Sequence, residues 1–164
     1  MMARIDFVTG NALLYLPEVE AIAGVPDRLE DALRGKSAGD LRKAGPDGRT
    51  GARVLGDVIA YAEADHVALH RMAWMSDPVI RTPDLEQIAE AERWDAQSPG
   101  ELIARLTRAV VETVELLKDQ PDASWGRPGL FPERRSLRQQ VRHSIAHYAA
   151  ETEALQGALN APRA

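Results

Sequence analysis

Cysteine is absent from this chain of 164 residues, and its absence excludes several kinds of chemistry. Without thiols the chain has no disulfide, no thiolate metal ligand and no cysteine nucleophile. If the protein carries out thiol chemistry, the thiol therefore belongs to a cosubstrate. Histidine is also scarce, with four residues in the whole chain.

Long hydrophobic runs and excess positive charge are missing as well. No segment reaches the roughly 18 apolar residues expected of a membrane span, and the first residues lack the basic region, apolar run and cleavage site of a signal peptide. We therefore expect a cytoplasmic protein. Its 20 basic and 25 acidic residues give a net charge of −5, so no positive field attracts nucleic acid or anionic lipid. A glycine-rich phosphate loop and a G-x-S-x-G motif are also absent.

The composition that remains is that of an ordinary folded domain. Apolar residues make up 45% of the chain and charged residues 27%, far from the charge-rich composition of disordered proteins. A chain of this length buries a substantial core without disulfides or metals. We therefore expect one domain over residues 1–164.

Two helix starts carry a complete signal. Ser98 is followed by proline and then by Glu101, and Ser136 is followed by Gln139, so each serine has a glutamate or glutamine three residues later. This spacing is the capping box, in which two side chains satisfy the free N–H groups of a helix start. Behind each serine, apolar residues recur every three or four positions. We expect long helices from both serines, the first stopped by Pro121.

The other helices are predicted from periodicity alone. Apolar residues repeat at helical spacing from about residue 50 to 74, and again in the first 35 residues, where Pro26 begins a second piece. A short helix is plausible over residues 84–94, and the segments between are rich in glycine, proline and aspartate, as loops are. No alternating strand pattern is present. The prediction is an all-α fold, a four-helix bundle with an additional short helix.

Tryptophan is interpreted as packing rather than function. Large aromatic side chains contribute most to burial in a small domain. We therefore expect Trp74, Trp94 and Trp125 to anchor the core.

The last predicted helix carries the most suggestive polar residues. His143, His147 and Glu151 follow one another at intervals of four, a spacing that stacks side chains along a helix. By helical geometry His147 and Glu151 lie about 115° and about 75° from the centre of the apolar stripe, while His143 points away from it. Two ligands four residues apart on one helix are a recurrent way to hold a metal. A solvated surface pair is the alternative.

A second group lies on the helix expected from residue 50 onward. Asp65, His66 and His70 are close together in sequence, and Asp65 falls on the apolar face, where it can bond a neighbouring side chain. We interpret all three as structural.

Three stretches resemble the DinB-like superfamily, of the DinB/YfiT type, whose members are helical bundles. Residues 50–63 resemble the start of the family's second helix, residues 125–129 its W-x-R-x-G turn, and residues 136–155 its last helix. The likeness covers about residues 25–160, although each motif is loose. It implies the same four-helix bundle, and homodimers, which are frequent in that family.

The resemblance also implies a metal site. The family commonly holds a metal with one histidine of the second helix and two of the last, and these positions correspond here to Asp57, His147 and Glu151. Two histidines are thus replaced by carboxylates, a ligand set that favours Mn, Fe or Mg over Zn. The expected cofactor is a divalent ion among Mn, Fe, Ni and Zn. Alternatively, Asp57 pairs with an arginine such as Arg142.

Two functions are left open, and no catalytic residue is assigned. The first is a metal-dependent transferase or hydrolase-like enzyme, in which the metal activates a low-molecular-weight thiol or water against a small-molecule substrate. The second is a non-catalytic bundle that lost the metal site and serves as a binding or dimerisation module.

Overall fold

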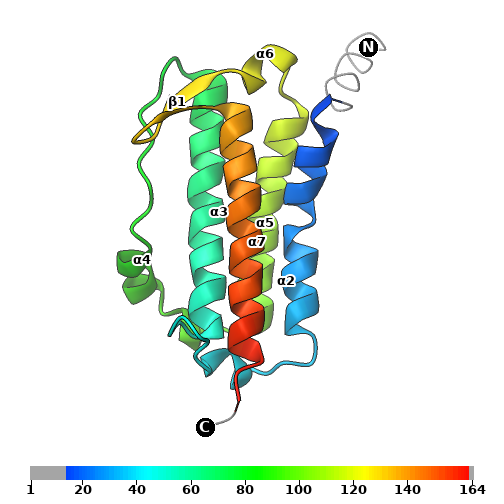
Figure 1. Cartoon of the computed structure of the whole chain (residues 1–164), viewed down its shortest axis with the longest axis vertical. Helices are drawn as coiled ribbons and strands as arrows, with labels where there is room; N and C mark the ends of the chain where they lie inside the picture. The colour runs from blue at the N-terminus through cyan, green and yellow to red at the C-terminus, as the bar shows by residue number, and fades with distance from the viewer. Residues whose placement is uncertain (1–13, 163–164) are drawn as a thin grey trace.

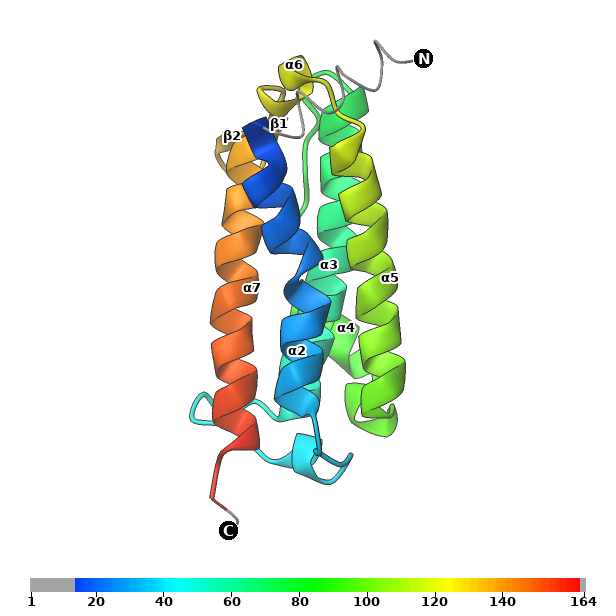
Figure 2. The same cartoon turned by 90° about the vertical axis from the view of Figure 1, so that its right-hand side faces the viewer.

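The computed structural model describes residues 14–162 and shows an elongated helical bundle (Figure 1). Its long members are the helices of residues 14–33, α3 (Gly51–Trp74), α5 (Pro99–Lys118) and α7 (Leu137–Leu159). These lie side by side along the long axis of the molecule (Figure 2). The predicted all-α four-helix bundle is confirmed.

The first long member is divided, as its sequence predicts. Residues 14–23 are helical, Gly24 forms a turn, and α2 (Val25–Leu33) continues the path with a proline in its first turn. Pro26 lacks the N–H that an uninterrupted helix needs but fits the start of a new one. Leu13, which belongs to the apolar pattern of the first 35 residues, lies outside the described residues.

Side-chain caps begin the other three long helices. Both capping boxes are present, with the backbone N–H of Glu101 donating to the side chain of Ser98 and that of Gln139 donating to Ser136. Thr50 accepts from the backbone N–H of Arg53 at 3.1 Å. Each cap satisfies N–H groups that have no partner inside the helix, and so fixes where the helix starts.

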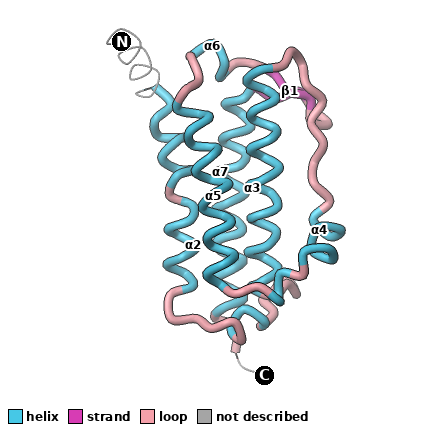
Figure 3. The backbone as a smooth tube through the Cα atoms, turned by 180° about the vertical axis from the view of Figure 1, so that it is seen from behind, coloured by secondary structure: helices cyan, strands magenta, loops and turns pink. Residues whose placement is uncertain are grey.

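The order of the helices determines which ends meet. The segment between α3 and α5 returns along the length of the bundle and carries α4 (Leu85–Glu92) on its way (Figure 3). As a result α3 and α5 run parallel, whereas α7 runs antiparallel to both (Figure 1). The beginning of α3 and the end of α7 therefore lie at the same end of the bundle.

The core forms around α3, which packs against both α5 and α7. At Gly56, α3 lies so close to the crossover segment that a side chain would not fit: a Cβ there would lie 2.2 Å from the ring of Trp94. The largest side chains with almost no exposure come from every long helix. They include Ile22, Leu29, Leu55, Ile59, Leu69, Met72, Leu102, Leu106, Leu117, Trp125 and Leu137.

The structure corrects several expectations about the loops. The segment after α5 contains α6 (Asp122–Trp125) and a small antiparallel hairpin of β1 (Pro128–Leu130) and β2 (Arg134–Ser136). The segment before α3 contains the short helix η1 (Asp40–Arg42), and the short helix predicted near residue 84 is α4, followed by η2 (Trp94–Ala96). Among the described residues no helix is long and apolar enough to cross a membrane.

One tryptophan does not belong to the core. Trp94 and Trp125 are each 2% exposed, as expected, but Trp74 is 69% exposed. Trp74 is the last residue of α3, beyond the part of the helix that α5 and α7 cover, so helical periodicity no longer predicts burial there. Ile145 lies four residues after the buried Val141, at the spacing of one apolar face of α7, but it is only partly buried.

Candidate functional site

A tight turn before α3 carries an arginine to the shared end of α3 and α7. The backbone N–H of Gly45 donates to the carbonyl of Arg49 at 2.8 Å, and Gly48 adopts a φ of +82°, which favours glycine. Gly45 packs so tightly that a Cβ there would lie 3.0 Å from Cα of Ala158 on α7. The turn is therefore held against the end of α7.

From this turn, the Arg49 guanidinium bridges two of the predicted site residues. Its Nη1 donates to Oδ2 of Asp57 at 3.1 Å and to Oε2 of Glu151 at 2.8 Å, and its Nη2 donates to Oε1 of Glu151 at 3.2 Å. The hydrogen bonds with Glu151 are the main reason why the pKa of Arg49 is raised above its usual value. The turn, α3 and α7 thus meet on one charged group.

A second arginine completes the environment of Asp57. Nε of Arg53 donates to Oδ1 of Asp57 at 2.7 Å, and Nη2 of the same arginine donates to Glu86 of α4 at 2.9 Å. The side chain of Asp57 is only 4% exposed. A buried carboxylate is costly unless paired and hydrogen-bonded, and here each of its oxygens accepts from a different guanidinium.

His147 lies beside this network and is not hydrogen-bonded to it. Its Nε2 is buried and has no hydrogen-bond partner within the described residues, and its ring stacks on that of Tyr61 with centroids 3.9 Å apart. Burial lowers the pKa of His147, while the carboxylates of Glu151 and Asp57 act in the opposite direction. His143, one turn earlier, is exposed, as helical geometry predicts.

The arrangement does not fit a bound metal. All four carboxylate oxygens of Asp57 and Glu151 accept from guanidinium N–H groups, so an ion between them would have to displace Arg49. Nor does any group of three or more His, Asp or Glu side chains within residues 14–162 have the geometry of a metal site. Of the three expected ligands, only His147 has a free donor atom. The metal-ligand role of these residues stays a prediction, while the expected alternative, pairing of Asp57 with arginine, is present.

The arginines that pair with Asp57 are Arg49 and Arg53, not Arg142, which the sequence analysis named. Arg142 lies 3.4 Å from Glu18 instead. The Arg53–Asp57 contact follows the i, i+4 rule for helices and was accessible from sequence. The Arg49–Glu151 contact joins residues 102 positions apart, and no local pattern indicates it.

A second polar cluster links the same two helices further along. Asp65 of α3 accepts from Nε2 of Gln140 and from Oγ of Ser144, each at 2.8 Å, and Tyr61 lies 3.0 Å from the Ser144 hydroxyl. The carboxyl of Asp65 is fully buried, and this burial raises its pKa to about 6. Burial likewise raises the pKa of Tyr61 to about 12. Asp65 bonds neighbouring side chains, as the sequence suggested.

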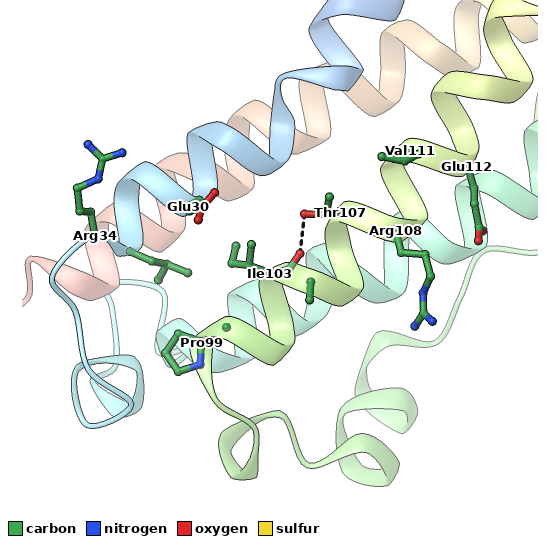
Figure 4. A pocket seen from close by; sticks show the side chains of 11 residues that line it. Glu30, Arg34, Pro99, Ile103, Thr107, Arg108, Val111 and Glu112 are labelled. Atoms are coloured by element: carbon green, nitrogen blue, oxygen red, sulfur yellow. Dashed lines mark hydrogen bonds between the residues drawn. The ribbon is translucent and has the colours of Figure 1, made fainter.

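A separate groove lies between α2 and α5 and has a volume of about 930 Å³ (Figure 4). Glu30 of α2 and Arg34 just after α2 line one side, whereas Pro99 and Ile103 line the other from α5. None of the three predicted site residues borders it. The groove and the Arg49 network therefore belong to different pairs of helices.

Comparison with known proteins supports the fold. No family model and no curated protein matches the sequence. The structure is similar to YfiT from Bacillus subtilis, described as a probable metal-dependent hydrolase with an unusual four-helix bundle topology. The TM-score is 0.79 at 17% sequence identity, over 85% of this chain and 82% of YfiT. The resemblance drawn from the sequence is confirmed at the level of the fold.

Proposed function

We propose that this chain is a metal-independent protein with the YfiT fold, a non-catalytic binding and self-association module in which Arg49 takes the place of a metal. The observation that supports this is the guanidinium bridge from Arg49 to Asp57 and Glu151. A guanidinium can orient two carboxylates through its five N–H donors. It has no vacant coordination position for a water or thiol, so it cannot lower the pKa of a nucleophile as a metal does.

A metal-dependent hydrolase or transferase is the second candidate. It is favoured by the description of YfiT as a probable metal-dependent hydrolase and by the free Nε2 of His147. In this case Asp57, His147 and Glu151 would hold a divalent ion, Arg49 would have to move away, and water or a low-molecular-weight thiol would attack a small-molecule substrate.

Metal analysis of protein purified without chelators or a histidine tag separates the two. Our proposal predicts the same metal content for wild type and for His147→Ala, and the same response of both melts to added Mn²⁺. The second candidate predicts one ion per chain and a stabilisation of about 2.7 kcal/mol at 100 times the Kd. That stabilisation would be lost in His147→Ala and kept in His143→Ala, the matched control on the exposed face.

Removal of Arg49 tests the bridge itself. Arg49→Ala leaves Glu151 without its hydrogen-bond donor and Asp57 with one arginine instead of two, so denaturant unfolding should show a loss of about 2–4 kcal/mol. Arg34→Ala is the control, because Arg34 forms an exposed pair with Asp31, and such pairs contribute about 0–1 kcal/mol. An Arg49→Ala loss no larger than that of the control would contradict the proposal.

A further inference from the structure

Two of the four histidines form a pair that the Arg49 network does not involve. His66 and His70 follow each other by one helical turn on α3, and their ring centroids are 6.4 Å apart. His70 is exposed and His66 partly so. Neither ring pairs with a carboxylate in the part of the chain that the structure describes. Imidazoles four residues apart on one helical face are the arrangement that binds zinc in H-E-x-x-H helices.

The ring of His66 is oriented by α5. Its Nδ1 lies 3.4 Å from the hydroxyl of Thr113, and that hydroxyl donates its own proton to the carbonyl of Ala109 at 3.1 Å. The Thr113 oxygen is therefore free to accept a hydrogen bond, and this favours the tautomer of His66 that carries its proton on Nδ1. The lone pair is then on Nε2. A partner at the other ring nitrogen is how proteins typically fix the orientation of a metal-binding histidine.

The next turn of α3 adds an indole. The ring of Trp74 lies 6.4 Å from that of His70 and is 69% exposed. Since the other two tryptophans are buried, Trp74 is a fluorescent reporter placed beside the histidine pair.

We propose that His66 and His70 form a second, surface metal site, which binds one borderline transition-metal ion through their two Nε2 atoms with water at the remaining positions. Imidazole ligands suit Cu²⁺, Ni²⁺ and Zn²⁺, and the general order of affinities places Cu²⁺ first. Rotation about the side-chain torsions brings the rings together, because His70 is exposed and the contact with Thr113 is made by Nδ1 of His66 and not by Nε2. This site is independent of the proposed function, since it shares no residue with the Arg49 network.

Titration of the full chain, without a histidine tag, with CuCl2 at about pH 7.5 tests the site, because neutral imidazole is the form that binds metal. We expect one equivalent of Cu²⁺ to quench the tryptophan emission, with reversal by EDTA. His66→Ala and His70→Ala should each weaken binding by more than about tenfold, because each removes one of the two imidazole ligands. Trp74→Phe should remove the quenching while calorimetry still detects the ion.

His143→Ala and His147→Ala are the controls. Both should titrate as wild type does. Unchanged Cu²⁺ affinity in His66→Ala and in His70→Ala would overturn the proposal. Binding lost only in His147→Ala would also overturn it and would contradict the proposed metal-independent function at the same time. The titration therefore distinguishes a failure of the His66–His70 site from a failure of the proposed metal-independent function.

Discussion

Asp65 should make the stability of this bundle depend on pH. Its carboxyl is buried between α3 and α7, where Gln140 and Ser144 donate to it, and no arginine or lysine within residues 14–162 pairs with it. Tyr61 from its own helix and Tyr148 from α7 also lie close enough to affect it electrostatically. The hydrogen bonds favour the charged carboxylate, but burial outweighs them, so the pKa rises from 3.8 to about 6.

The sign of the effect follows from the two pKa values. Because the folded-state pKa is the higher one, the proton stabilises the folded state at low pH, and this contribution is lost as pH rises through about 6. The full shift corresponds to about 3 kcal/mol. About 1.4 kcal/mol of that is lost between about pH 5 and pH 8.

The substitution Asp65→Asn isolates the contribution of Asp65 protonation to stability. The amide has the same shape and does not titrate, and the Ser144 hydroxyl can rotate to donate to the carbonyl of Gln140 at 3.0 Å instead. We expect the variant to be more stable than wild type at about pH 8, and its advantage to shrink by about 1.4 kcal/mol at about pH 5.

Urea unfolding at several pH values measures both proteins under identical conditions, so that the titration of His147 cancels in the difference. Glu153→Gln on the exposed face of α7 removes the same charge without burial and should show no such trend. If the difference in unfolding free energy between Asp65→Asn and wild type stays constant from about pH 5 to 8, the reasoning is refuted.

Two further predictions concern packing and assembly. Gly56→Ala places a methyl group 2.2 Å from the Trp94 ring, so thermal and denaturant unfolding should show a loss of about 1–3 kcal/mol, despite the better helix propensity of alanine; equal or greater stability would mean that Trp94 is not packed there. Self-association through a two-fold interface should appear in sedimentation velocity as a dimer at rising concentration, and a strict monomer would contradict that part of the proposed function.

Local signals in the sequence predicted the helices well and the site only in part. The starts at Ser98 and Ser136 were predictable because a capping box is complete within four residues. The hairpin was missed because its strands have three residues each, too few to show alternation. The position of His147 came from helical geometry, but its environment depends on Arg49, which folding brings from a distant turn.

The two polar links between α3 and α7 differ in what they respond to. At the shared end, Arg49 and Arg53 are 29% and 24% exposed, so the charged link is partly screened by dissolved salt. About two turns further along α3, Asp65 is fully buried without a cation, so its link responds to protons and hardly to salt. At the first position the guanidinium groups bridge the carboxylates at the edge of the bundle, where water still reaches them. Beside Asp65, an arginine would itself be buried, and the cost of burying its charge would offset the gain from pairing with the carboxylate. Hydrogen bonds from the uncharged side chains of Gln140 and Ser144 are less costly there.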